Sequence, residues 1–136
     1  MPADFDAIPE TEWAYLAGLI DGEGCINVFI GSGGAFDLQL KISQKNKSDL
    51  HKIASEFGSK FNPNSNTNSY QLCWCGHEAE AILRKVFPYL KWKKEEAELA
   101  ISFACEVMCG KGNQQNKPLG QFVKEELSAI KEAKYA

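Results

Sequence analysis

Two acidic residues, Asp21 and Glu23, stand two positions apart, with Gly22 between them and Gly24 directly after them. Carboxylates and backbone carbonyls are the oxygen ligands that hard divalent cations such as Mg²⁺ take up, with water completing the shell. The glycines on either side of Glu23 leave the backbone bare, so a phosphate group could approach it closely. The tetrapeptide could therefore hold a divalent cation next to a phosphate.

The element that must position these acids is a helix predicted to end at Gly22. Ala14, Gly18 and Gly22 recur every fourth residue and share one helix face, with Asp21 beside it. This face has almost no side chains, so another backbone can come very close. Two glycines inside a helix cost about 1 kcal/mol each relative to alanine, which an ordinary amphipathic helix would not carry. We expect the face to pack closely against another helix, with acidic groups at the end of that contact.

Residues 16–24 read LAGLIDGEG. The nonapeptide resembles the LAGLIDADG motif of the homing endonucleases position for position, with Gly22 and Glu23 where the name has Ala and Asp. The acidic replacement keeps the carboxylate at the eighth motif position. The resemblance implies a DNA endonuclease encoded within an intron or intein, with an αββαββα fold, a curved antiparallel sheet and C-terminal helices.

The apolar patterns predict the same α+β order without the motif. The first expected elements are a helix from about Pro9 or Thr11 to Gly22 and strands over 25–30 and 36–43. A helix over 48–57, capped by Ser48-Asp49, and strands near Phe61 and over 70–75 follow. The rest comprises helices over 78–87 and 93–108, a polar loop over 110–118 and a last amphipathic helix through Ile130. A chain of 136 residues fits one domain. We expect a single domain over 1–136, with a core over about 10–108 and a C-terminal loop and helix over 109–136.

One motif per chain has a consequence for assembly. Cutting both strands of a duplex needs two sites, so the second must come from a twofold partner through a self-complementary interface. We predict a homodimer whose interface contains Ala14, Gly18, Asp21 and Gly22. A direct metal role for Asp21 is left open.

The resemblance also implies site residues. The acid at the eighth motif position binds the catalytic metal in the family, which assigns that role to Glu23, with the Gly22 carbonyl as a further ligand. The expected cofactor is Mg²⁺, for which Ca²⁺ or Mn²⁺ can substitute. Gln44 and Lys93 match a family glutamine after the second strand and a lysine after the third helix. Gln44 would position solvent and Lys93 would lie near the attacking water or the scissile phosphate, with a solvated surface position as the alternative for each.

The polar faces of the strands are the predicted reader of double-stranded DNA. Antiparallel strands can enter the major groove, where each base pair presents a distinct pattern of donors and acceptors. The candidate readers are Asn27, Phe29, Asp37, Gln39, Lys41, Lys60, Asn62, Asn64, Gln71 and Cys73. Lys45, Lys47 and Lys91 are expected to contact the phosphate backbone, which positions the protein without specifying sequence.

The formal net charge of −3, taken alone, argues against nucleic-acid binding. Its distribution changes that conclusion. Residues 1–24 carry six acids and no lysine or arginine, and residues 25–94 carry ten basic residues against five acids. A basic middle flanked by acidic ends fits one binding face on a mildly acidic body, although chance clustering of solvated lysines would explain the charges equally well.

Five cysteines, an odd number in a chain without a recognisable secretory signal, favour a reducing intracellular compartment and free thiols. Cys73, Cys75 and His77 could share one face of a strand, and Cys105 and Cys109 stand one helical turn apart. Neither group has the C-x2-C spacing typical of zinc sites, so we expect no zinc. No apolar run approaches the roughly 20 residues of a membrane helix, so we expect no membrane partner. An organellar, archaeal, bacterial or phage context all remain open.

Two other interpretations compete with the endonuclease. The first keeps the fold without cleavage, as a DNA-binding regulator or an RNA-binding maturase acting on intron RNA. The intact Glu23, Gln44 and Lys93 argue against a silent site. The second is a dimeric module that binds no nucleic acid and is linked by zinc through its thiols, for which the acidic charge balance is the only support.

Overall fold

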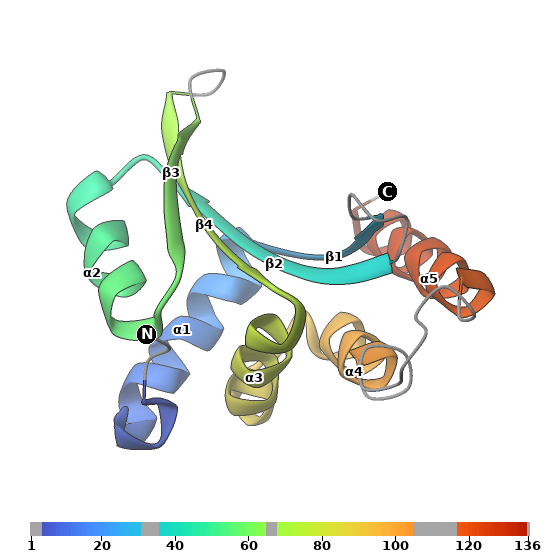
Figure 1. Cartoon of the computed structure of the whole chain (residues 1–136), viewed down its shortest axis with the longest axis horizontal. Helices are drawn as coiled ribbons and strands as arrows, with labels where there is room; N and C mark the ends of the chain where they lie inside the picture. Colours follow the sequence, from blue (N-terminus) through green and yellow to red (C-terminus); the bar gives the residue numbers. More distant parts are fainter. Residues whose placement is uncertain (1–3, 31–35, 65–67, 105–116, 136) are drawn as a thin grey trace.

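The computed structural model describes residues 4–30, 36–64, 68–104 and 117–135, in which helices alternate with antiparallel strands (Figure 1). In chain order the elements are η1 (Phe5–Ala7), α1 (Glu10–Glu23), β1 (Gly24–Ile30), β2 (Phe36–Gln44), α2 (Lys47–Phe57), β3 (Lys60–Asn64), β4 (Ser69–Cys75), α3 (Gly76–Val86), η2 (Phe87–Tyr89), α4 (Lys94–Phe103) and α5 (Lys117–Tyr135). The predicted αββαββα order with further C-terminal helices is confirmed.

The four strands form one antiparallel sheet in the order β1-β2-β4-β3. Each hairpin pairs strands that follow one another in the chain, and the central β2–β4 pairing joins the two hairpins. In Figure 1 the sheet is curved, α1, α3 and α4 lie on one side of it, and α5 lies beside β1 at the end opposite α2. The other side of the sheet is thus free of α1, α3 and α4.

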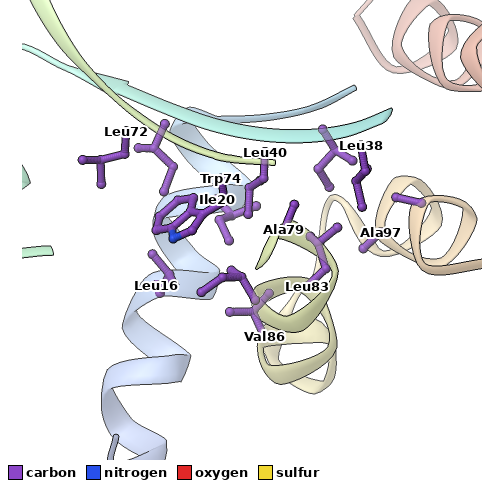
Figure 2. Close-up of a cluster of buried hydrophobic side chains, with 14 of the residues drawn as sticks. Leu16, Ile20, Leu38, Leu40, Leu72, Trp74, Ala79, Leu83, Val86 and Ala97 are labelled. Atoms are coloured by element: carbon purple, nitrogen blue, oxygen red, sulfur yellow. The ribbon is translucent and has the colours of Figure 1, made fainter. Parts of the chain in front are cut away.

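Alternation of buried and more exposed residues, clearest along β2, separates the two faces of the sheet. The buried set comprises Ile26, Val28, Phe36, Leu38, Leu40, Ile42, Leu72 and Trp74. Figure 2 shows that strand side chains such as Leu40 and Trp74 meet Leu16 and Ile20 of α1 and residues of α3. The Trp74 indole Nε1 donates to the Phe57 carbonyl at 3.1 Å, so the ring's polar atom is satisfied inside the core. Ile30, the last residue of β1, continues this alternation but is 54% exposed.

The start of α2 differs from the predicted cap. The cap is Asn46, whose side-chain oxygen accepts from the Asp49 N–H at 3.2 Å, and the helix already begins at Lys47. Ser48 and Asp49, the predicted caps, therefore lie in the first turn. Gly58 ends the helix with φ of 70°, the left-handed conformation that glycine adopts without a Cβ penalty.

The helices after the second hairpin begin and end at other residues than predicted. α3 starts at Gly76, directly after β4, and Phe87 belongs to the short η2 with Pro88. α4 runs from Lys94 to Phe103. The predicted continuation to Met108 and most of the polar loop after it lie outside the described residues.

α5 packs against β1 and α4 through a buried face that includes Val123 and Leu127. Gly120, in its first turns, faces the ring of Phe36 on β2. A Cβ on Gly120 would stand 2.4 Å from Phe36 Cγ, so glycine is what lets the helix come this close. In the part of the chain that the structure describes, no helix is both long and apolar enough to cross a bilayer.

Candidate functional site

The motif helix α1 ends at Glu23, and Gly24 turns the chain directly into β1. The Gly24 N–H donates to the Ile20 carbonyl, which closes the last turn of the helix. A Cβ on Gly24 would lie 2.7 Å from the Ile20 carbonyl oxygen and 2.8 Å from its Cα, both rigid backbone atoms. Only glycine fits this turn without a backbone shift. Glu23 is thereby held, exposed, at the junction of helix and sheet.

A pocket of about 330 Å³ opens at this junction, lined by Gly22, Glu23, Gly24, Cys25, Lys93, Glu96 and Lys131. The motif end of α1 and the start of β1 form one wall. The start of α4 and the last turns of α5 supply the others. Of the predicted catalytic and metal-binding residues, the pocket therefore unites Gly22, Glu23 and Lys93. It combines two carboxylates with two lysines, a set that suits a cation and a phosphate together.

Asp21 fixes the loop that carries Lys93. Its Oδ2 accepts from the Lys91 N–H at 2.8 Å, and its Oδ1 accepts from the N–H groups of Trp92 at 3.2 Å and Lys93 at 3.0 Å. The Lys93 ammonium in turn donates to the Asp21 carbonyl at 3.0 Å. Lys93 is only 5% exposed, and α4 begins at the next residue, so the Asp21 carboxylate also faces the positive end of that helix dipole.

This arrangement gives Asp21 a role within the protomer that the sequence did not indicate. Both carboxylate oxygens are used by backbone N–H groups, which argues against a direct metal role. Its place at the helix interface stays a prediction.

We expect Asp21→Asn to loosen the pocket. Asparagine keeps one acceptor oxygen and replaces the other with an NH₂ group, so the Lys91 N–H loses its partner. The remaining hydrogen bonds are then made to a neutral amide oxygen instead of a carboxylate. We expect a loss of about 1–2 kcal/mol in the free energy of unfolding, the lower part of the range for charged hydrogen bonds because the loop is partly exposed. Urea unfolding measures it, with Glu98→Gln on the exposed side of α4 as control. Equal stability of the two variants would contradict the tethering role.

Three pocket residues were not predicted from the sequence: Cys25, Glu96 and Lys131. Glu96 is completely buried on the inner side of α4, and its Oε1 accepts from the Lys134 ammonium at 3.0 Å. Lys131 donates to the Ile26 carbonyl at 2.8 Å. One signal was present in the sequence, because Glu96 stands four residues before Ala100 and therefore shares a helix face with a small apolar residue.

Gln44 does not line this pocket. It is the last residue of β2 and stands two positions after the buried Ile42. Because side chains alternate between the faces of a strand, it lies on the helix-covered face. There it lines another depression together with Tyr15 and Leu19 of α1. Its carboxamide oxygen accepts from the Lys45 N–H at 3.0 Å. The predicted solvent-positioning role of Gln44 stays a prediction.

The predicted reading residues fall into rows across the face of the sheet opposite the buried side chains. One row runs through all four strands as Cys25, Lys41, Cys73 and Lys60. The neighbouring rows contain Asn27, Gln39 and Cys75 on one side and Ser43, Gln71 and Asn62 on the other, with Phe29 opposite Asp37 and Asn64 opposite Ser69 towards the two ends. Strand register thus brings residues that are far apart in sequence onto one mainly polar surface.

Basic side chains lie after the end of β2, around the start of α4 and on α5. Lys45 and Lys47 follow the end of β2 and are exposed, and the Lys47 ammonium stands 5.7 Å from the centre of the Tyr70 ring. Lys91 and Lys94 line a shallow depression with Lys134 and Trp92, whose side chain is 67% exposed. The Lys131 ammonium lies 2.7 Å from Asn27 Oδ1, so α5 reaches the edge of the reading face.

The thiols form no zinc-type cluster among the described residues. Cys73 and Cys75 share a strand face with their sulfur atoms 3.6 Å apart, but His77 lies in α3 and its ring faces Glu80, which corrects the predicted three-residue face. Burial, together with the neighbouring Cys73, raises the pKa of the Cys75 thiol to about 11. A protonated thiol is a poor metal ligand. Cys105 and Cys109 lie outside the described residues.

The bare face of α1 is exposed in the protomer. Trp13, Leu16, Ala17 and Ile20 are buried on the opposite side of the helix, whereas Ala14, Gly18 and Gly22 face solvent. Nothing lies within 4 Å of where a Cβ would stand on Gly18 or Gly22. Packing among the described residues of one chain therefore does not require the two glycines, and their place in a dimer interface stays a prediction.

Comparison with known proteins identifies the class. Residues 16–103, more than half of the chain, match the sequence model of the LAGLIDADG endonucleases. The chain belongs to this family. No curated protein sequence matches it significantly.

Solved structures have the same fold at low sequence identity. The homing endonuclease I-CvuI, in complex with its target in the presence of 2 mM Ca, superposes with a TM-score of 0.76 at 20% identity over 89% of this chain and 82% of that one. The archaeal intron-encoded I-Vdi141I complexed with DNA gives 0.72 at 20% identity over 89% and 84%. The homing endonuclease I-TnaI gives 0.65 at 17% identity over 93% and 97%.

Proposed function

We propose that this protein is a homodimeric, metal-dependent endonuclease that cuts both strands of DNA at a long, pseudo-palindromic site. The observation that carries the proposal is the end of α1, where the exposed Glu23 carboxylate lies at a pocket and adjoins a helix face without side chains. Packing that face on its copy would bring two Glu23 side chains together near the twofold axis. Two such sites match the two strands of a duplex.

The donor set of the pocket suits a hard cation. It offers the two oxygens of the Glu23 carboxylate and the Gly22 carbonyl oxygen. All are oxygen ligands, which Mg²⁺ and Ca²⁺ take up in preference to thiols. No cluster of three or more acidic, histidine or cysteine side chains is found in the described parts of the chain, so water, a DNA phosphate and the partner protomer would complete the shell.

We assign roles to the chain's own groups as follows. When bound, the cation supplies a positive charge at the phosphate and makes its bound water more acidic. Glu23 holds the cation and Gly22 offers its carbonyl. Lys93, held in place by Asp21, presents an ammonium to the phosphate or the attacking water.

The polar rows of the sheet support DNA reading. Their amides suit adenine, and lysines such as Lys41 and Lys60 suit guanine or a phosphate. Lys45 and Lys47, which follow the end of β2, and Lys91, in the loop before α4, would contact the phosphate backbone and make affinity fall with salt. Two copies of this surface, related by the dimer axis, would read two half-sites.

Cleavage of a randomised plasmid library in Mg²⁺ tests the proposal, with Ca²⁺ as a binding-only condition. Double-strand breaks at a discrete sequence would support it and reveal the target. Specific binding in Ca²⁺ without cutting in Mg²⁺ would instead indicate a regulator or a maturase. No binding at all would exclude DNA as the substrate.

A further inference from the structure

Glu96 is the one buried acidic side chain among the described residues, and half of its carboxylate is unused. It lies in the first turn of α4 with no exposed surface, and its Oε1 accepts from Lys134 at 3.0 Å. Its Oε2 is buried and has no hydrogen-bond partner in the described structure. Buried polar atoms are nearly always paired, so an unpaired carboxylate oxygen requires a specific reason.

Anchoring α5 to α4 does not supply that reason. The ion pair with Lys134 occupies only one oxygen, and a buried charge without full hydrogen bonding is costly. The nearby Lys131 ammonium does not compensate for it, since that ammonium donates to the Ile26 carbonyl and Asn27 Oδ1. An apolar residue would pack between the helices at lower cost.

The position of Glu96 does supply a reason. It lines the same pocket as Glu23, and the roughly 330 Å³ of that pocket leave room for several water molecules. A hydrated divalent cation held by Glu23 would present water hydrogens inside this pocket. Mg²⁺ in particular keeps several of its waters when it binds to protein carboxylates.

We propose that Glu96 is a positioning residue for the divalent cation, its free Oε2 accepting hydrogen bonds from the cation's bound water. This inference rests on the proposed function and goes beyond the motif acids. Lys134 fixes the carboxylate through Oε1 and leaves Oε2 without a partner among the described residues. The pair links the C-terminal helix α5 to the metal site of the motif helix α1.

Titration with Mn²⁺ alone, followed by electron paramagnetic resonance, tests this on the full chain without DNA. We expect Glu96→Gln, which keeps the shape and the contact to Lys134, to weaken Mn²⁺ binding by about 10-fold or more, as for other groups that orient a metal's ligands. Glu95→Gln, the exposed neighbour on the same helix, is the matched control and should bind Mn²⁺ like the wild type. Unchanged Mn²⁺ affinity in Glu96→Gln, or no Mn²⁺ site in the wild type, would overturn the inference.

A second variant distinguishes a role of Glu96 in positioning the cation from a role in anchoring α5 to α4. It also provides a test if Glu96→Gln does not fold. Lys134→Gln breaks the same ion pair but keeps the Glu96 carboxylate. We expect it to retain or strengthen Mn²⁺ binding, whereas a purely structural pair predicts the same loss as in Glu96→Gln. The Mg²⁺ concentration for half-maximal cleavage separates the two proposals. If the wild type cuts DNA and Glu96→Gln needs no more Mg²⁺ than the wild type, this inference alone is overturned. If the wild type cuts no DNA, the proposed function is overturned, and the Mn²⁺ titration alone decides whether Glu96 positions the cation.

Discussion

Glu23→Gln should lower the rate of DNA cleavage by at least about a thousandfold. This factor corresponds to the loss of several kcal/mol of charge stabilisation at the phosphate. The exchange keeps the shape of the side chain and removes the charge that would hold the cation. Because Glu23 is exposed and makes no hydrogen bond to another described residue, we expect the fold to keep its stability. The measurement is the rate of plasmid linearisation in Mg²⁺.

DNA binding should survive this exchange, because the predicted reading surface lies on the sheet rather than at the end of α1. Fluorescence anisotropy with a target duplex in metal-free buffer measures it. Glu12→Gln, an acid at the other end of the same helix, is the control and should cut normally. Wild-type cleavage by Glu23→Gln would remove the metal role from this residue and with it the proposed mechanism.

Gly18→Leu should convert the dimer to a monomer. The protomer has open space where the new side chain begins, and leucine is a better helix former than glycine by roughly 0.5–1 kcal/mol, so folding should not suffer. Between two closely packed α1 helices, the same side chain would force the backbones apart. Sedimentation velocity should show monomers, and double-strand cleavage should disappear.

Ser55→Leu, an exposed position on α2, is the matched control and should remain dimeric. If Gly18→Leu still sediments as a dimer and still cuts, the bare face of α1 is not the interface. The two glycines would then need another explanation, since packing within one chain does not require them.

Local pattern alone was enough to predict much of the fold. Alternation in β1 and β2, with Leu38 and Leu40 turned inward, defined the first hairpin and its polar face. Spacing of small residues in α1 indicated a bare face, and the helix was predicted to end at Gly22, one residue before its observed end at Glu23. These features depend on neighbours within a few residues, which periodicity and glycine placement report directly.

What the sequence did not reveal depends on contacts between distant segments. Glu96 meets Lys134 only because α5 packs on α4, a contact that no pattern within either helix specifies. The Asp21 carboxylate binds a loop seventy residues later in the chain, so a side chain assigned to an interface has a second role inside the protomer. The cap of α2 was misplaced by two residues, because Asn46 and Ser48 are both good capping residues and only the geometry distinguishes them.

The most direct test of the central claim uses a mixed dimer of one wild-type protomer and one Glu23→Gln protomer, purified through two different tags. If each protomer contributes its Glu23 to the cutting of the duplex, the mixed dimer will bind the target but no longer linearise a plasmid in Mg²⁺. Linearisation at the wild-type rate would show that one Glu23 is sufficient for both strands and would contradict the account of two sites meeting at the end of α1.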